Sequence, residues 1–196
     1  QQSMDGGATF SNIAGATSAT LSFAAVQTQS GNQYRVVVTN TCGTTTSTAA
    51  TLTVNSAPVV TLNPTNQTVI ASQTAVFSAG ATGTPTPTVQ WQFSNDGGAT
   101  FQNVAGATIT TLTVPNVSAG QNGQKFRAVF TSSAGSATTT AATLTVTFAP
   151  TVTLNPVSAT VTPGQTATFM AAANGNPTPT VQWQVQSVAD GPFVDV

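Results

Sequence analysis

The stretch "PTPTVQWQ" at residues 85–92 returns unchanged at residues 177–184. Trp183 therefore follows Trp91 after an interval of 92 residues. This interval is about twice the length of a propeller blade, which has roughly 40–50 residues. It is close to the size of a β-sandwich domain, which has roughly 100 residues. The sequence thus consists of repeats, each long enough to form a small sandwich.

The repeats are not in phase with the numbering of the chain. A complete copy runs from residue 57 to residue 148, residues 1–56 match the C-terminal part of a preceding copy, and residues 149–196 match the N-terminal part of a following one. The interval between equivalent positions is 91 residues on the N-terminal side of 115–125 and 92 residues beyond it. The N-terminal Gln-Gln has no initiator Met and no apolar leader, so we expect a segment of a longer protein.

Within the complete copy, apolar residues alternate with Thr, Gln and Ser. Alternation with a period of two, in segments rich in Val and Thr, predicts β-strands that are buried on one face. Strands are predicted around "AVFSA" (75–79), "VQWQF" (89–93), "ITTLTV" (109–114), "FRAVF" (126–130) and "AATLTV" (141–146), with a split first strand at 59–63 and 67–70. The expected core residues are Phe77, Trp91, Leu112, Phe126 and Leu144, with Trp183 in the last copy.

The Trp strand resembles a known family. "GTPTPTVQW" (83–91) and "GNPTPTVQW" (175–183) resemble the G-x-P-x-P-x-V-x-W entry to the third strand of immunoglobulin I-set domains. The later "LTVPNVS", "FRAVF", "SSAG" and "AATLTV" are similar to the family's remaining strand motifs. The resemblance implies an all-β protein of tandem immunoglobulin-like β-sandwiches, one complete and two partial. Similar tandem modules occur in large bacterial surface and secreted proteins.

The chain departs from the family at its two best-known core features. The positions of the paired cysteines hold Ala79 and Ala128, and Cys42 is the only cysteine, so no intrachain disulfide can form. The tyrosine of the family's corner is kept as Tyr34 but is Phe126 in the complete copy. The resemblance implies that the complete copy lacks the hydrogen bond of that hydroxyl.

A second motif, S-x-D-x-G-x-T-F, occurs at residues 3–10 and 94–101. It resembles the Asp-box of sialidases and other β-propellers, but Asp and Gly are also the residues that tight hairpin turns require. We interpret it as a structural turn, because one Asp per hairpin cannot supply the roughly six to eight oxygen ligands of a calcium ion. The predicted turn residues are Asp5, Gly6 and Gly7 in the first copy and Asp96, Gly97 and Gly98 in the second.

The composition excludes several classes of function. Charged residues make up 4% of the chain, the net charge is −1, and there is no His. Catalysis by general acids and bases needs positioned titratable groups, and only four acidic residues are present. We therefore expect no enzyme, no catalytic or cofactor-binding residue and no metal site. We also expect no nucleic-acid partner, because there is no basic patch, and no membrane span in this segment.

These patterns favour a structural role outside the cell. We expect a secreted or cell-surface protein of bacterial type, in which tandem copies form a stalk, fibre or adhesive filament. Its partners would be neighbouring copies of the same repeat, joined head to tail either covalently or as separate subunits. The alternatives are a module that binds a host or cell-surface glycan or protein, and a non-catalytic spacer of a larger secreted enzyme.

Overall fold

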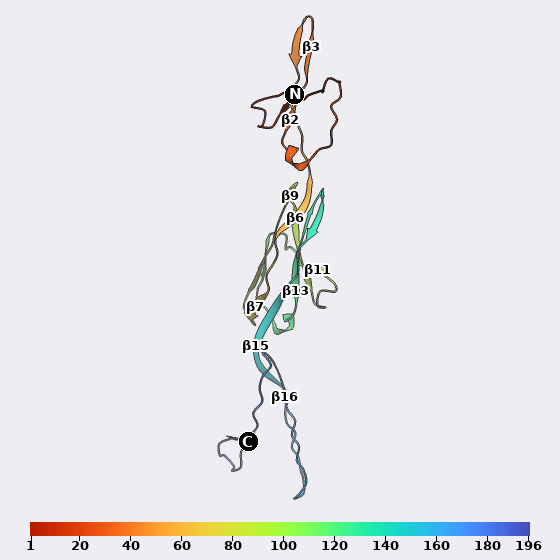
Figure 1. The fold of residues 1–196 in the computed structure, drawn as a ribbon. Coiled ribbons are helices and arrows are strands. Elements are labelled where there is room, and N and C mark those ends of the chain that lie inside the picture. The colour runs from red at the N-terminus through yellow and green to blue at the C-terminus, as the bar shows by residue number, and fades with distance from the viewer.

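The computed structural model describes all residues from 1 to 196. The chain is elongated, and three regions follow one another along its length (Figure 1). The N-terminal and C-terminal segments lie at opposite ends, and the complete copy lies between them. All regular structure is β apart from two short 3-10 helices, which confirms the predicted fold class. No helix is long and apolar enough to cross a membrane.

The complete copy forms a sandwich of two layers. One layer contains β11, β10, β13 and β15 in that order, with β14 paired to β13 and β7 paired in parallel to β15. The other contains the pairs β12–β8 and β6–β9. The strands are β6 Ser56–Leu62, β7 Gln67–Ile70, β8 Ala75–Ser78, β9 Gly80–Thr84, β10 Thr88–Ser94, β11 Gln102–Asn103, β12 Thr111–Val114, β13 Lys125–Ser132, β14 Gly135–Thr138 and β15 Ala142–Leu154, with helix η2 at Ala119–Gln121.

The register places the alternating apolar residues between the two layers. Trp91 of β10 lies opposite Ala128 of β13, and Leu112 of β12 lies opposite Phe77 of β8. The first strand is split, because β6 pairs antiparallel with β9 while β7 changes layer and pairs parallel with β15. These strands form an immunoglobulin-like sandwich without a disulfide.

The core lies entirely inside the complete copy. The Phe77 and Phe126 rings stack with their centroids 4.9 Å apart, and the fully buried Trp91 indole donates from Nε1 to the Ile109 carbonyl at 2.9 Å. The two positions that hold cysteine in the family, Ala79 and Ala128, are buried as well. The thirteen buried core residues are Ala75, Phe77, Ala79, Val89, Trp91, Leu112, Val117, Phe126, Ala128, Phe130, Ala142, Leu144 and Val146.

Strand β15 continues past the end of the complete copy. Its first residues pair with β13 and β7, and its last residues, from Phe148 to Leu154, pair with β16 of the following copy. The side-chain amide of Asn176 donates to the Val146 carbonyl at 2.6 Å across this junction. One strand and one side-chain hydrogen bond therefore join two successive repeats.

The two end segments contain shorter strands and almost no buried side chains. Ser3 and Asn32 are the buried residues of the first segment, and residues 149–196 contain none. The N-terminal elements are β1 Gln2–Ser3, η1 Gln27–Gln29, β2 Gln33–Tyr34, β3 Val37–Asn40, β4 Gly43–Thr46 and β5 Ala50–Thr51. The C-terminal elements are β16 Ala172–Asn176, β17 Gln184–Val185 and β18 Val194–Asp195.

The prediction that Trp183 lies in a core is wrong for this structure. Trp183 is 40% exposed, whereas its equivalent Trp91 is 0% exposed. The two tryptophans differ in exposure because different strands lie next to them. Trp91 lies opposite Ala128 on β13, but no strand equivalent to β12 or β13 packs against residues 149–196.

Candidate functional site

The recurring Asp motif forms a closed turn after β10. The buried Ser94 hydroxyl accepts a hydrogen bond from the Gly98 amide at 2.8 Å and donates to Asp96 Oδ1 at 2.7 Å. The Asp96 carboxylate also accepts from the backbone amide and the hydroxyl of Thr100. Because these bonds join both arms of the turn, the Asp side chain holds the loop closed from within.

The two glycines of this turn are required by its backbone. Gly97 and Gly98 have φ angles of 73° and 101°, in the left-handed region that favours glycine. The hydrogen bonds from Thr100 and Ser94 hold the pKa of Asp96 well below its usual range, since they stabilise the ionised carboxylate. The turn therefore uses the Asp charge for structure, and all the donors come from the turn itself.

The turn of the first copy has the same geometry. Ser3 and Thr9 donate to the Asp5 carboxylate and hold its pKa well below the usual range. Gly6 and Gly7 also have positive φ angles, of 74° and 96°. In the third copy the corresponding stretch, 187–193, reads "SVADGPF", and the acidic residue in it, Asp190, itself has a φ of 60°. Three copies thus close one hairpin with two different chemistries.

A second repeated contact lies beside each turn. The Arg127 guanidinium lies 3.7 Å from the centroid of the Phe101 ring, and its Nε donates to Gln92 Oε1 at 2.9 Å. In the first copy Arg35 makes the same contact with Phe10, at 3.8 Å. These two contacts were not predicted from the sequence. The recurrence of a Phe and an Arg at equivalent positions of the two copies was the available signal.

Neither the turns nor their surroundings contain a reactive centre. No group of three or more His, Cys, Asp or Glu side chains is close enough to hold a metal ion. The free thiol of Cys42 is exposed on the turn between β3 and β4, where the Cys42 amide donates to Asn40 Oδ1. The Asp5 and Asp96 carboxylates already accept hydrogen bonds from residues of their own turns. The arrangement stabilises hairpins and offers no nucleophile paired with a base.

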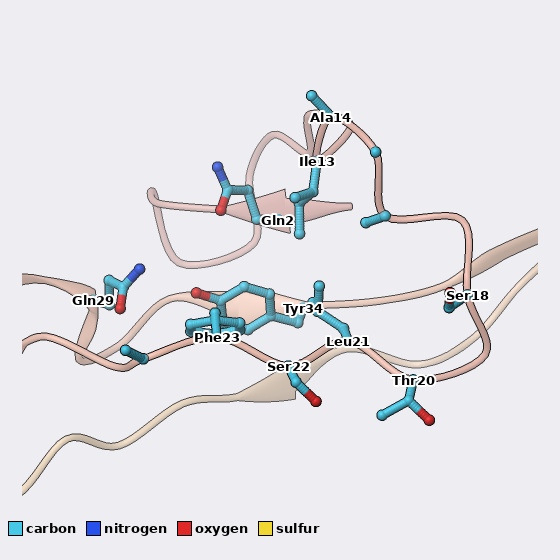
Figure 2. A pocket seen from close by; sticks show the side chains of 13 residues that line it. Gln2, Ile13, Ala14, Ser18, Thr20, Leu21, Ser22, Phe23, Gln29 and Tyr34 are labelled. Carbon is cyan, nitrogen blue, oxygen red and sulfur yellow. The ribbon is translucent and has the colours of Figure 1, made fainter.

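A concave surface lies on the N-terminal segment. A cavity of 460 Å³ is open beside Tyr34, and Figure 2 shows Ile13, Leu21 and Phe23 around it. The Phe23 and Tyr34 rings lie 5.2 Å apart, and the Tyr34 hydroxyl is buried without a hydrogen-bond partner. The corner hydrogen bond that the family resemblance implies for Tyr34 is therefore absent here. No charged side chain lines the cavity.

A family model and several curated proteins match the chain. The family described as "Domain of unknown function (DUF8696)" matches residues 1–56 and 61–150. Endoglucanase C of Cellulomonas fimi is 47% identical over 134 residues, which are 68% of this chain and 12% of that protein. Roundabout homolog 1 of Mus musculus is 34% identical over 152 residues, 78% of this chain and 9% of that protein. The chain thus spans only a small part of the relatives that it matches.

Solved structures of immunoglobulin domains also match. The N-terminal four Ig domains of Dscam1 isoform 4.44 match with 27% identity and a TM-score of 0.47, over 62% of this chain and 28% of that one. Titin domain M7 matches with 24% identity and a TM-score of 0.39, over 47% of this chain and 96% of that one.

Proposed function

Because the chain belongs to the family described as "Domain of unknown function (DUF8696)", whose model matches it in two successive segments, we propose that it is part of a tandem array of immunoglobulin-like repeats with a structural role outside the cell. The complete repeat spans residues 57–148, and the flanking segments 1–56 and 149–196 are parts of its neighbours. The array forms a stalk, fibre or adhesive filament of bacterial type and carries no catalytic residue.

The observation that carries this proposal is the junction between the complete repeat and the following copy. Strand β15 runs through it without a break, and Asn176 donates to the Val146 carbonyl from the next repeat. A continuous strand paired on both sides of a boundary resists bending more than a free linker does. With strands of about ten residues at roughly 3.3 Å per residue, plus turns, each repeat adds roughly 35–45 Å to a stiff rod.

A close glycine–proline contact repeats at the start of each copy. A Cβ atom on Gly83 would lie 3.2 Å from Cα of Pro58, and one on Gly175 would lie 3.3 Å from Cα of Pro150. The absence of a side chain on these glycines lets the strand that enters the repeat pack tightly against its partner. Proline also fixes φ in the entering strand. Both features favour a fixed orientation of each repeat relative to the preceding repeat.

A spacer in a larger secreted enzyme is the second candidate function. The 47% identity to a part of Endoglucanase C supports it, as that part makes up 12% of the relative. The spacer and the stalk use the same physical property, which is a fixed separation between the domains at their ends. The two functions differ in what is attached to the array, and a catalytic domain encoded in the same gene would favour the spacer.

Pulsed electron paramagnetic resonance can test the stiffness of the junction. Spin labels attached at Thr131→Cys in the complete repeat and Thr180→Cys beyond the junction, in a Cys42→Ser background, occupy exposed positions on its two sides. We expect one narrow distance distribution. A broad distribution would show a free hinge and would contradict the proposed rod.

A further inference from the structure

The Arg127 guanidinium is held in one position on the outer face of the complete repeat. It lies 3.7 Å from the centroid of the Phe101 ring, and its Nε donates to Gln92 Oε1 at 2.9 Å. The Gln92 side chain is fixed in turn, because its Nε2 donates to Asn103 Oδ1 at 3.0 Å. Residues of β10, β11 and β13 thus act together to position one cation.

The first copy repeats this arrangement contact by contact. The Arg35 guanidinium lies 3.8 Å from the centroid of the Phe10 ring and donates from Nε to Gln1 Oε1 at 2.8 Å. Gln1 Nε2 donates to Asn12 Oδ1 at 3.0 Å. Ordering an arginine side chain costs conformational entropy, and a side chain that is ordered in advance binds a ligand at a lower entropic cost. An arginine fixed in the same way in two copies is therefore preorganised for binding.

Both guanidinium groups keep their outer edge free. Each Nε atom donates within the protein, but the Nη atoms of Arg127 and Arg35 have no hydrogen-bond partner in the structure. The Nη groups of an arginine present their N–H donors in one fixed plane, which is the geometry that binds a carboxylate through two parallel hydrogen bonds. Each site therefore offers a vacant fork for an anionic group.

The complete repeat leaves this positive charge uncompensated. Its charged residues are Asp96, Lys125 and Arg127, which give two cations, one anion and a net charge of +1. The Asp96 carboxylate already accepts hydrogen bonds from Ser94 and Thr100 in its own turn. Lys125 and Arg127 lie on the same face of β13, because alternate residues of a strand point to one side. The outer face of β13 is therefore complementary to an anion.

A neutral, polar groove adjoins the guanidinium. Gln90 lies on the same face of β10 as Gln92, and it lines a groove of 720 Å³. Thr88, Thr108 and Thr110 also line the groove, and no charged residue does. Amide and hydroxyl groups can exchange hydrogen bonds with the hydroxyls of a sugar, and the volume lies within the range of small-ligand sites. The face thus combines one anion site with a groove for uncharged hydroxylated groups.

We propose that the outer face of β10, β11 and β13 binds an acidic polysaccharide, with the carboxylate of a uronic acid on Arg127 and neighbouring sugar hydroxyls in the groove. Nucleic acids fit this face less well, because they are held by many clustered cations. A protein partner also fits less well, because protein interfaces are centred on apolar and aromatic anchors, and the Phe101 ring is covered by Arg127. This binding is a further function beside the structural role.

The chain contains two of these sites. Arg35 occupies the position of Arg127 one repeat earlier, with the same two side-chain contacts. When one long polymer binds both sites, the second binding event is intramolecular, and the overall affinity exceeds that of either site alone. Loss of both arginines should therefore weaken binding more than loss of one.

Biolayer interferometry on immobilised polysaccharides tests the proposal with the full chain. The probes are polygalacturonate and alginate, measured in EDTA to exclude bridging by calcium. Methyl-esterified polygalacturonate is the matched control, because its sugar backbone is the same but its carboxylates are neutralised. We expect the chain to bind polygalacturonate at least about tenfold more tightly than the ester, since hydrogen bonds to a charged group account for a difference of this size.

Three variants separate a built site from a general effect of charge. Arg127→Lys keeps the charge but lacks the planar fork, so it should lose most of the affinity that Arg127→Gln loses. Lys125→Gln removes the same charge from the same strand and should weaken binding less than Arg127→Gln. Gln92→Ala leaves the net charge unchanged but removes the partner of Arg127 Nε, and it should also weaken binding. The Tm of each variant should stay close to that of the parent, because exposed polar contacts contribute little to stability.

Four results would overturn the inference. They are no binding to either acidic polysaccharide, equal binding of the methyl ester, equally tight binding of a single-stranded oligodeoxynucleotide, and an equal loss of affinity in Lys125→Gln and Arg127→Gln. If Arg127→Gln lowers the Tm, the comparison of Gln92→Ala with the parent decides, and unchanged affinity there would overturn the inference. The spin-label distances across the β15 junction do not depend on these results, so this site and the proposed rod are tested separately.

Discussion

Replacing Trp91 with Ala should unfold the complete repeat at a much lower temperature. The indole is fully buried between the two layers, opposite Ala128, and its Nε1 bonds to the carbonyl of Ile109. Truncation of a buried aromatic side chain costs roughly 3–5 kcal/mol. The lost hydrogen bond adds little, because Ile109 is exposed and water can replace the donor.

This cost is a large part of the roughly 5–15 kcal/mol that stabilises a small domain. At roughly 4–8 °C per kcal/mol for a domain of this size, it predicts a fall of roughly 12–40 °C in Tm, measured by differential scanning calorimetry. Trp183→Ala is the matched control, because it removes the same side chain from an exposed position in the same motif. Equal Tm shifts in the two variants, or none for Trp91→Ala, would refute the assignment of one core to residues 57–148.

The closed turn and the junction give four further predictions. Gly97→Val should destabilise the complete repeat by roughly 1–2 kcal/mol in urea unfolding, because it forces a branched side chain into the left-handed region. EDTA should leave the Tm unchanged, since Asp96 serves the turn and not a metal. The lowered pKa of Asp96 means that its carboxylate stabilises the turn above the unfolded pKa of about 3.9, and this contribution is lost as the pH falls through the folded pKa. Asn176→Ala should broaden the spin-label distances across the β15 junction, because it removes the hydrogen bond to the Val146 carbonyl.

Each of these predictions has a contradicting result. Unchanged urea unfolding in Gly97→Val would show that the turn tolerates another conformation. A marked fall of the Tm in EDTA would show that a bound metal ion stabilises the protein. Acid unfolding curves that are identical in the parent chain and in Asp96→Asn would show that the carboxylate contributes nothing to stability. Unchanged distances in Asn176→Ala would assign the stiffness to the continuous strand alone.

The alternation of apolar residues predicted most strands of the complete repeat and their inward faces, but not β9 or β14. Phe77, Trp91 and Leu112 each stand at inward positions of short strands, and a period of two allows only one face to be apolar. Val117 was harder to predict, because it is fully buried but lies between β12 and η2, outside any strand. Its burial follows from the path of the loop, which no periodicity encodes.

Contacts between distant segments could not be predicted from the sequence. The stacking of Arg127 on Phe101 depends on the register of β10, β11 and β13, and the Asn176–Val146 bond depends on the angle between two repeats. The burial of Trp183 could not be predicted from its local sequence for the same reason. Its local sequence is that of a buried strand, but its burial depends on strands that do not pack against residues 149–196 in this structure.

The Asp motif was predictable as a turn but not in its details. Asp and Gly at fixed spacing indicated a hairpin with positive φ angles, and Gly97 and Gly98 have them. The role of Ser94 was missed, although the serine recurs at Ser3 with the same spacing to the Asp. A serine hydroxyl that accepts from one arm of the turn and donates to the carboxylate is recognisable only when both partners are in place.

Electron micrographs of the native protein test the central claim, which is that the repeats form a stiff array. The account predicts straight rods or fibres with an axial repeat of roughly 35–45 Å, the length of one sandwich. Compact particles, or beads joined by freely bending linkers, would contradict it.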